Sequence, residues 1–290
     1  MLLAMLSMSC MNIVLRSMAG IVHSTQIVVI RHFFCILLVI LWTGALQRGI
    51  PKFPTKRLGS HFWRSMCGVV AMEMWFYSVT IMPINIITAL SFTMPIFSAI
   101  FAIMFLGEKA GIRRWSAIFV GFVGTLIILR PDISGISHAG WVVIAASFLM
   151  AASGTMVKSL TKSESPENIA FYMAVFMLIA SIPFALPYWR EVSVQSLLLI
   201  LLLSIFATAA HLFMARAFVR AEMVVLMPFD FTRLIFTAIL AYIFFGEELN
   251  KNTAIGASII ASSTIYIANR EAIVRKKKAA NLLEGEEIIA

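Results

Sequence analysis

The sequence predicts an all-α membrane protein with ten transmembrane helices, arranged as two inverted five-helix repeats. Three observations support this fold class: the hydropathy of the chain, the placement of its basic residues, and an internal repetition of short motifs. Of the 290 residues, 61% are hydrophobic and only 13% are charged, and the mean hydropathy is +0.94. A soluble domain carries roughly a quarter charged residues, so most of this chain is expected to lie in lipid.

Ten apolar stretches are separated by short polar turns, and each is close to the roughly 20 residues that a helix needs to cross a bilayer. They are residues 2–20, 25–46, 62–81, 84–106, 114–130, 139–158, 167–188, 194–215, 222–245 and 252–268. The first stretch lacks the basic leading segment and A-x-A-like cleavage site of a signal peptide, so we expect it to be retained. Because no polar residues precede this helix, a natural start upstream of Met1 stays open.

The basic residues predict the orientation of the chain. With the N-terminus inside, 17 Lys and Arg residues lie in the inner loops and tail, against four outside. The inner set is Arg48, Lys52, Lys56, Arg57, Arg64, Lys109, Arg113, Arg114, Lys158, Lys162, Arg216, Arg220, Arg270, Arg275, Lys276, Lys277 and Lys278. The outer set is Arg16, Arg130, Arg190 and Lys251. The positive-inside rule then places both termini in the cytoplasm of a cell with this protein in its inner membrane.

The net charge of +9 follows from this topology and from contact with anionic lipid. A nucleic-acid partner is therefore not expected.

Two similar motifs divide the chain into halves. Phe105-Leu106-Gly107-Glu108-Lys109 closes the predicted fourth span, and Phe244-Phe245-Gly246-Glu247-Glu248 closes the ninth, 139 residues later. Since five spans per half is an odd number, the second half begins on the opposite side of the membrane. Inverted repeats of this kind are common in secondary transporters, whose substrate site lies near the midplane. We assign residues 1–135 to the first repeat, 136–270 to the second and 271–290 to a charged cytoplasmic tail.

The prolines do not follow the same offset. Pro95 pairs with Leu234, and Pro228 pairs with Ala89. Matched broken helices, which would locate a site directly, are therefore not predicted.

Charged side chains inside the spans are the main candidates for a site, since each costs roughly 2.5–3.5 kcal/mol in hydrocarbon. By helical rise, Glu73 lies about 16 Å into the third span, and Asp230 and Arg233 lie about 12 and 16 Å into the ninth. Glu73 has no opposite charge at helical spacing, so it is the strongest candidate for binding substrate or a proton. Asp230 and Arg233 could line a polar cavity, or they could neutralise each other as an i,i+3 pair.

Four further residues complete the predicted substrate path. Arg31, about 9 Å below the outer edge of its span, could bind an anionic group or extend its head to water. His211 could relay protons or serve as a hydrogen-bonded packing residue. Tyr77 shares a helix face with Glu73 at i+4, and with Phe229 it could offer aromatic surface to a substrate.

Glu108 and Glu247 lie at the membrane edges, with Glu108 inside and Glu247 outside. They could form gate contacts with basic neighbours such as Arg113 or Lys251, or they could merely end their helices. A row of small residues, Ala117, Gly121 and Gly124, is typical of a close helix-packing face.

Several classes of function are disfavoured. Cys10, Cys35 and Cys67 lack paired spacing, so no disulfide framework, metal site or cofactor is expected. The sequence has no G-x-x-x-x-G-K-[ST] phosphate loop, so a gradient is expected to supply energy instead of ATP. The five His residues are scattered, which argues against an enzyme.

These motifs together resemble the drug/metabolite transporter superfamily, and in particular its EamA-type members with ten helices. The likeness covers nearly the whole chain and rests on the two Gly-Glu closures with Ser91-Phe92-Thr93-Met94-Pro95, Arg113-Arg114-Trp115, Gly121-Phe122-Val123-Gly124, Arg130-Pro131, Met227-Pro228-Phe229-Asp230 and Arg233-Leu234. A narrower likeness to S-adenosylmethionine uptake transporters rests on Arg31-His32-Phe33-Phe34, Arg64 and residues 91–97. The resemblance implies a carrier of small metabolites.

The charges of the deep residues narrow the expected substrate. Glu73, Asp230, Arg31 and Arg233 sum to zero, which disfavours polyanions, and a purely lipophilic drug would need none of them. We expect a small zwitterionic or cationic metabolite, with S-adenosylmethionine as the leading candidate. The alternatives are a drug or amino-acid efflux carrier of the same family and a non-transporting scaffold or channel. Expected partners are the substrate, membrane lipid, protons as coupling ion and a second copy in a homodimer.

Overall fold

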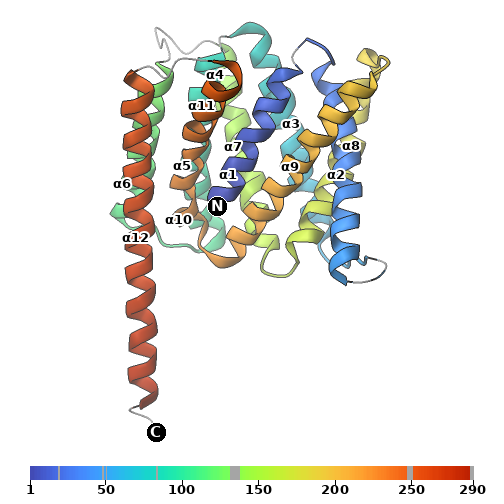
Figure 1. Cartoon of the computed structure of the whole chain (residues 1–290). Helices are drawn as coiled ribbons and strands as arrows, with labels where there is room; N and C mark the ends of the chain where they lie inside the picture. The colour runs from blue at the N-terminus through green and yellow to red at the C-terminus, as the bar shows by residue number, and fades with distance from the viewer. Residues whose placement is uncertain are drawn as a thin grey trace.

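The computed structural model describes the whole chain except residues 19, 48, 50, 83, 131–137, 247–250 and 288–290. The described residues form a bundle of helices with no β-strand (Figure 1). The helices are α1 (Leu2–Ser17), α2 (Ser24–Gln47), α3 (Leu58–Ile81), α4 (Ile84–Ser91), α5 (Met94–Leu106), α6 (Ile112–Leu129), α7 (His138–Leu160), α8 (Pro166–Ala185), the 3₁₀ turn η1 (Leu186–Tyr188), α9 (Val194–Arg220), α10 (Met223–Asp230), α11 (Thr232–Phe245) and α12 (Lys251–Glu287). The all-α prediction is therefore confirmed.

Seven segments of the described chain are long and apolar enough to cross a membrane. They are residues 24–45, 86–106, 112–129, 138–160, 166–188, 194–220 and 223–245. The apolar helix α1 is shorter than this criterion requires. The chain is thus a multi-pass membrane protein, and ten spans stays a prediction.

The helix bounds follow the predicted spans closely, with three extensions, the first of which is the start of α3 at Leu58, four residues before the predicted start. α9 continues to Arg220, five residues past the predicted end, and α12 continues to Glu287. Helix α12 therefore includes most of the segment that we assigned to a charged tail. The last three residues of the predicted seventh span form the turn η1.

Contrary to the prediction from the prolines, the two halves carry matched helix interruptions. The first falls at Phe92–Thr93 between α4 and α5, and the second falls at Phe231 between α10 and α11, at the 139-residue offset. The aligned sequences are Ser91-Phe92-Thr93 and Asp230-Phe231-Thr232. The expectation of unmatched breaks was wrong because it considered only proline.

A threonine lies at the same repeat position in both interruptions. Thr93 Oγ1 donates to the Leu90 carbonyl at 2.7 Å, and Thr232 Oγ1 donates to the Phe229 carbonyl at 2.6 Å. A hydroxyl that binds a carbonyl of the preceding turn competes with the helical backbone bond and bends the helix. Pro95 adds to the first break, since it has no N–H for the Ser91 carbonyl. That carbonyl instead accepts a bond from Ser147 Oγ of α7 at 3.4 Å.

The two interrupted helices run in opposite directions. In Figure 1, α4 lies at the top and α5 continues below it, whereas α10 lies at the bottom and α11 continues above it. Packing between the halves has the same two-fold pattern. Helix α1 of the first half packs on α9 of the second, and their repeat counterparts, α7 and α3, pack on each other. Likewise α5 packs on α7, and α11 packs on α1.

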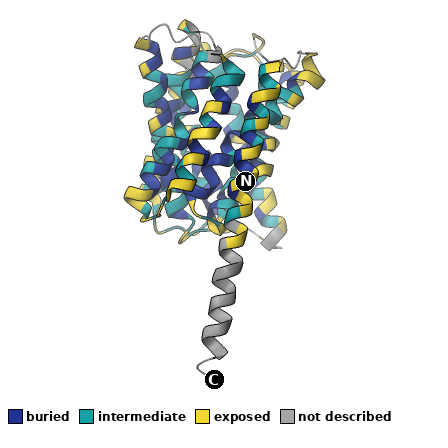
Figure 2. Ribbon diagram, turned by 90° about the vertical axis from the view of Figure 1, so that its left-hand side faces the viewer, coloured by how far each residue is buried: buried dark blue, intermediate teal, exposed yellow. Residues whose placement is uncertain are grey.

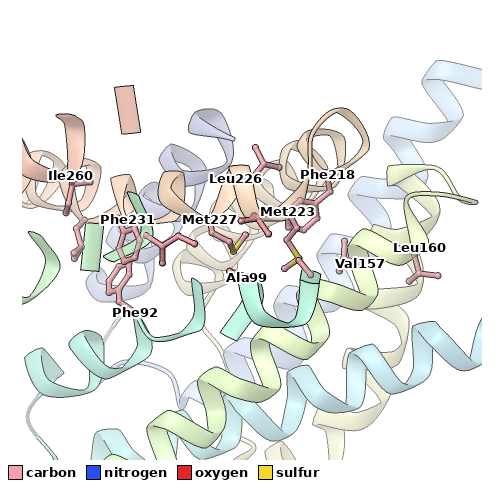
Figure 3. Close-up of a cluster of buried hydrophobic side chains, with 14 of the residues drawn as sticks. Phe92, Ala99, Val157, Leu160, Phe218, Met223, Leu226, Met227, Phe231 and Ile260 are labelled. Carbon is pink, nitrogen blue, oxygen red and sulfur yellow. The ribbon is translucent and has the colours of Figure 1, made fainter. Parts of the chain in front are cut away.

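The surface and core of the bundle fit a lipid environment. Large apolar side chains are exposed on its outside, among them Trp63, Phe105 and Val194, and Figure 2 shows exposed residues distributed along the helices. The largest buried cluster joins helices α5 to α12, and Figure 3 shows its members Met223, Leu226 and Met227 of α10. Every residue of α10 except Phe229 is buried.

The predicted small-residue row packs closely, as expected. A Cβ on Gly124 would lie 2.8 Å from Ile260 of α12, and one on Gly256 would lie 2.5 Å from the Gly124 carbonyl. Ser263 Oγ of α12 also donates to the Ala117 carbonyl at 2.9 Å. Helices α6 and α12 therefore approach each other at distances that only glycine permits.

Candidate functional site

The aromatic residues at the two interruptions meet in the interior. The rings of Phe92 and Phe231 stack with centroids 5.6 Å apart and an interplanar angle of 22°. Both side chains are buried, and Figure 3 shows the two rings side by side. A Cβ on Gly121 of α6 would lie 2.5 Å from the Phe231 ring, so glycine is required beside this pair. The two halves of the chain therefore touch through equivalent residues.

Asp230 and Arg233 flank this aromatic pair. Asp230 ends α10, and Arg233 lies in the first turn of α11. Their closest charged atoms, Oδ2 and Nη2, are 3.9 Å apart, which is longer than a charge-assisted hydrogen bond. The Arg233 guanidinium also lies over the Phe92 ring, 5.1 Å from its centroid. The two charges attract each other loosely while Arg233 contacts the opposite repeat.

Helix α1 fixes the backbone at this point. Ser9 Oγ donates to the Arg233 carbonyl at 3.0 Å, and Thr237 Oγ1 donates to Ser9 Oγ at 3.1 Å. Ser9 is fully buried. The Asp230–Arg233 segment is therefore held by helices from both halves.

A second group of charged residues lies between α2, α3 and α9. Arg31 Nη2 lies 3.3 Å from His32 Nε2. The guanidinium groups of Arg31 and Arg64 both lie close enough to His211 to interact with it electrostatically. Arg64 was placed with the inner loop residues by the sequence prediction, but its side chain is only 4% exposed. Helix α3 begins four residues before its predicted span and packs Arg64 against α8, which buries the side chain within the protein, whereas its position on the cytoplasmic side stays a prediction.

Glu73 lies apart from both groups. It is partly buried on α3, and its Oε1 is enclosed without a hydrogen-bond partner in the described part of the chain. Tyr77, one turn later, is 51% exposed, and Phe229 is partly buried beside Asp230. Among the described residues no ion pair joins Glu73 to the other predicted site residues. The structure thus gathers Asp230 with Arg233, and Arg31 with His211, in two separate places.

Glu108 caps a helix. Its carboxylate oxygens accept bonds from the backbone N–H groups of Met223 and Val224, at 2.8 and 2.9 Å, in the first turn of α10. An anion at a helix N-terminus is favourable because four N–H groups there lack helical partners. Lys158 lies nearby, donates to the Ala221 carbonyl at 2.5 Å and attracts Glu108 electrostatically. Its predicted counterpart, Glu247, lies outside the described residues.

Further polar contacts join helix ends and loops at the same end of the bundle. His61 Nε2 lies 2.6 Å from Glu164 Oε2, and Arg216 pairs with Glu167 at 2.9 Å. Arg114 pairs with Glu222, next to the start of α10. The His61–Glu164 and Arg114–Glu222 contacts join the two halves at this end, and Arg216–Glu167 lies within the second half.

A cavity of about 400 Å³ lies beside that closed end, between α6 and α12. Its lining comprises Lys109, Gly111, Ile112, Arg113, Arg114, Glu222, Ile267 and Arg270. Four cations and one acid give it a strongly basic character. Within the described residues, no group of three or more His, Cys, Asp or Glu side chains is placed to hold a metal.

Sequence reasoning missed His32, Arg64, Phe92 and Phe231 as site residues. The signal for the two phenylalanines was present, since both triplets that contain them align at the repeat offset. His32 and Arg64 lie in the motifs that carry the narrower family likeness, but their proximity to His211 depends on how three distant helices pack.

The profile of the EamA-like transporter family matches residues 1–130 and again residues 139–269. The chain belongs to the EamA-like transporter family. Each half therefore contains one EamA unit, and the EamA protein is a transporter and not an enzyme.

Two curated relatives show what this EamA chain is similar to. It is 28% identical over 280 residues to an S-adenosylmethionine uptake transporter of Rickettsia felis, covering 96% of this chain and 95% of the relative. It is 32% identical over 241 residues to a riboflavin transporter of Rhizobium johnstonii, covering 78% of each chain. A solved crystal structure shares the fold with a TM-score of 0.77 at 14% identity, over 92% of this chain and 93% of that chain.

Proposed function

We propose that this EamA protein is a secondary transporter that moves small zwitterionic or cationic metabolites across the inner membrane by alternating access. S-adenosylmethionine is the leading named substrate. The observation that carries the proposal is the pair of interrupted helices, whose equivalent residues Phe92 and Phe231 stack beside Asp230 and Arg233. Interrupted helices at the repeat interface are where secondary transporters place their substrate sites.

The proposed topology is ten spans in two inverted repeats, 1–135 and 136–270, with both termini in the cytoplasm. The opposite directions of the two interrupted helices support it (Figure 1). The charge bias of the loops supports the orientation. In this arrangement the contacts of Glu108 and Lys158 close the cytoplasmic end.

The proposed substrate class follows from the charges inside the bundle. Acidic and basic groups are both present, with Asp230 near Arg233 and Glu73 on α3. A zwitterion can pair with both signs, and each such pairing offsets part of the cost of a charge in hydrocarbon. S-adenosylmethionine carries a carboxylate, an amine and a sulfonium, and the name of the Rickettsia felis relative favours it. Phe229 and Tyr77 are the proposed aromatic surface for its cationic or apolar part.

The other proposed partners are protons, lipid and a second copy of the chain. Glu73 is the proposed proton or amine site, because its Oε1 is enclosed without a partner in the described chain. The basic cavity at Arg113 and Arg270 suits the headgroup of an anionic lipid. His211 interacts electrostatically with Arg31 and Arg64, and it is the proposed proton relay or substrate ligand beside them.

Riboflavin transport is the second candidate function. The Rhizobium johnstonii relative, a riboflavin transporter, is 32% identical to this chain. Riboflavin is uncharged, so it would leave the buried charges without a ligand. Export of a drug or amino acid remains a further alternative within the same family.

Flux measurements in proteoliposomes test the proposal. Labelled S-adenosylmethionine, an aromatic amino acid, riboflavin and a sugar phosphate are compared in both directions under an imposed proton gradient. We expect saturable flux of a zwitterion that depends on the gradient. Flux of riboflavin alone would favour the second candidate, a preference for the sugar phosphate would contradict the charge argument, and no saturable flux would favour a scaffold or channel.

A further inference from the structure

Four basic side chains from three helices form a basic cluster, in which His32 and Arg64 are buried and Arg31 and His211 are partly buried. They are Arg31 and His32 of α2, Arg64 of α3 and His211 of α9. Arg31 contacts His32 directly, and His211 interacts electrostatically with Arg31, Arg64 and His32. None of the ion pairs in the described part of the chain involves a member of this cluster.

The contacts that the cluster does make are to neutral acceptors. Arg64 donates to the Ile169 carbonyl at 3.2 Å and to Met173 Sδ at 3.1 Å. Arg31 donates weakly to Met11 Sδ at 3.8 Å. These acceptors orient the guanidinium groups, but they do not neutralise their charge.

Several donors of the cluster have no partner at all in the described chain. Nε of Arg31, Nε of Arg64 and Nδ1 of His211 are enclosed and make no hydrogen bond. Arg64 is 4% exposed and His32 is 1% exposed. An unpaired charge in such surroundings is costly, because neither water nor an opposite charge replaces its hydration. An anionic ligand would supply both the charge and the acceptors.

We propose that the basic cluster binds the carboxylate of the transported metabolite. This inference rests on the proposed function, and it assigns the carboxylate end of the zwitterion to the basic cluster. The two oxygens of a carboxylate match the planar donors of a guanidinium, and such charge-assisted bonds are about twice as strong as neutral ones. His211 lies within the field of both guanidinium groups and is a further donor to the same anion.

The inference revises the substrate argument from the sequence. That argument counted Arg31 and Arg233 as the deep bases and balanced them against Glu73 and Asp230. Arg233 already has Asp230 3.9 Å away, whereas Arg31 and Arg64 have no carboxylate in the described chain. The interior therefore has a basic region separate from its acids, which suits a molecule whose opposite charges are held apart.

Matched ligands that differ in one anionic group test the inference, a carboxylate in the first two pairs and a phosphate in the third. The first pair is S-adenosylmethionine and its decarboxylated form, the second is tryptophan and tryptamine, and the third is riboflavin and its phosphate ester. Dissociation constants come from thermal stabilisation of the purified full-length protein. We compare the unmodified protein with Arg31→Gln, Arg64→Gln, Arg64→Lys and His211→Gln. Arg57→Gln serves as the matched control, since Arg57 bonds Ser159 at 3.0 Å outside the cluster.

The unmodified protein should bind the carboxylate-bearing member of a pair at least tenfold more tightly. Arg31→Gln and Arg64→Gln should remove most of that preference and leave the affinity for the decarboxylated member unchanged, while Arg64→Lys should retain part of it. Arg57→Gln should keep the preference intact. Equal weakening of both members would overturn the inference and make the cluster structural, as would the absence of any carboxylate preference in the unmodified protein. A variant that fails to fold leaves the test to the other three.

Failure of the inference is distinguishable from failure of the proposed function. Zwitterion flux without a carboxylate preference would contradict the inference alone. A cluster-dependent carboxylate preference without zwitterion flux would contradict the proposed function alone. Preference for the phosphate ester over riboflavin, without preference in the other two pairs, would assign the cluster to phosphate and overturn the carboxylate assignment.

Discussion

Phe92 and Phe231 occupy the same position in the two halves of the chain, 139 residues apart, and their rings stack on each other in the interior. Each lies at the interruption of its own helix, next to a threonine whose hydroxyl bonds a backbone carbonyl. A contact between equivalent residues lies on the pseudo-two-fold axis that relates the repeats. Movement of one half against the other must therefore shift or break this stack.

Gly121→Ala should destabilise the protein, because the new Cβ would lie 2.5 Å from the Phe231 ring. Overpacking of this kind costs about 1–3 kcal/mol. We expect the apparent melting temperature of the purified protein to fall by several degrees. Gly121→Ala combined with Phe231→Leu should recover part of the loss, since the smaller side chain frees the space.

Gly59→Ala is the matched control for Gly121. Gly59 lies in α3, and a Cβ there would meet nothing within 4 Å. Alanine is favoured over glycine in a helix by up to about 1 kcal/mol, so the melting temperature should stay or rise. Equal melting temperatures for the two alanine variants would rule out the close contact between α6 and Phe231.

Glu108→Ala should open the end of the bundle that its carboxylate closes. The substitution removes both bonds to the first turn of α10, and loss of a helix N-cap costs about 0.5–2 kcal/mol. The exposed Glu191, replaced by Ala, is the control. The measurement uses a protein whose three native cysteines are Ala and which carries a single cysteine at buried Val225. In the Glu108→Ala variant this cysteine should react with an impermeant maleimide about fivefold faster than in the protein that keeps Glu108. An unchanged rate would show that Glu108 only ends its helix.

Much of the fold could be predicted from the sequence because lipid imposes a simple pattern. Apolar stretches of fixed length are required to cross a bilayer, and the Gly107 and Gly246 closures mark the ends of two of them. Both glycines adopt positive φ, +70° and +66°, as a left-handed helix end requires. The helix interruptions could not be predicted from proline alone, because the residues that both interruptions share are Thr93 and Thr232, whose hydroxyls bond a carbonyl of the preceding turn.

The candidate site was less predictable, because it depends on which helices meet. Asp230 and Arg233 are neighbours on one segment, so their pairing was visible in the sequence. The cluster around His211 joins residues that are up to 180 positions apart, from Arg31 to His211. Hydropathy alone placed Arg64 at a membrane edge, whereas packing against α8 buries it.

The charge bias of the loops predicts that both termini are cytoplasmic. A reporter that is active only outside the cytoplasm should be silent when it is fused after Ala290. The same reporter inserted near Arg190, in the loop before α9, should be active. The reverse pattern would contradict the orientation, and equal activity at both positions would contradict the ten-span count.

Glu73→Gln should reduce transport at least tenfold while the protein keeps its normal abundance in the membrane. Glu73 is the acidic group of α3, and its enclosed Oε1 has no hydrogen-bond partner among the described residues. A carboxylate in that position is costly unless it binds a proton or a cationic group during the transport cycle. Glutamine keeps the size and hydrogen-bonding capacity of the side chain but removes both the charge and the proton site.

Flux of the labelled substrate under an imposed proton gradient measures the effect, with Glu191→Gln as a control in an exposed loop. Unchanged flux would assign Glu73 to packing, and loss of the protein from the membrane would assign it to folding. A loss of gradient-driven accumulation with intact exchange of substrate across the membrane would identify Glu73 as the proton site, since exchange does not require the proton to move.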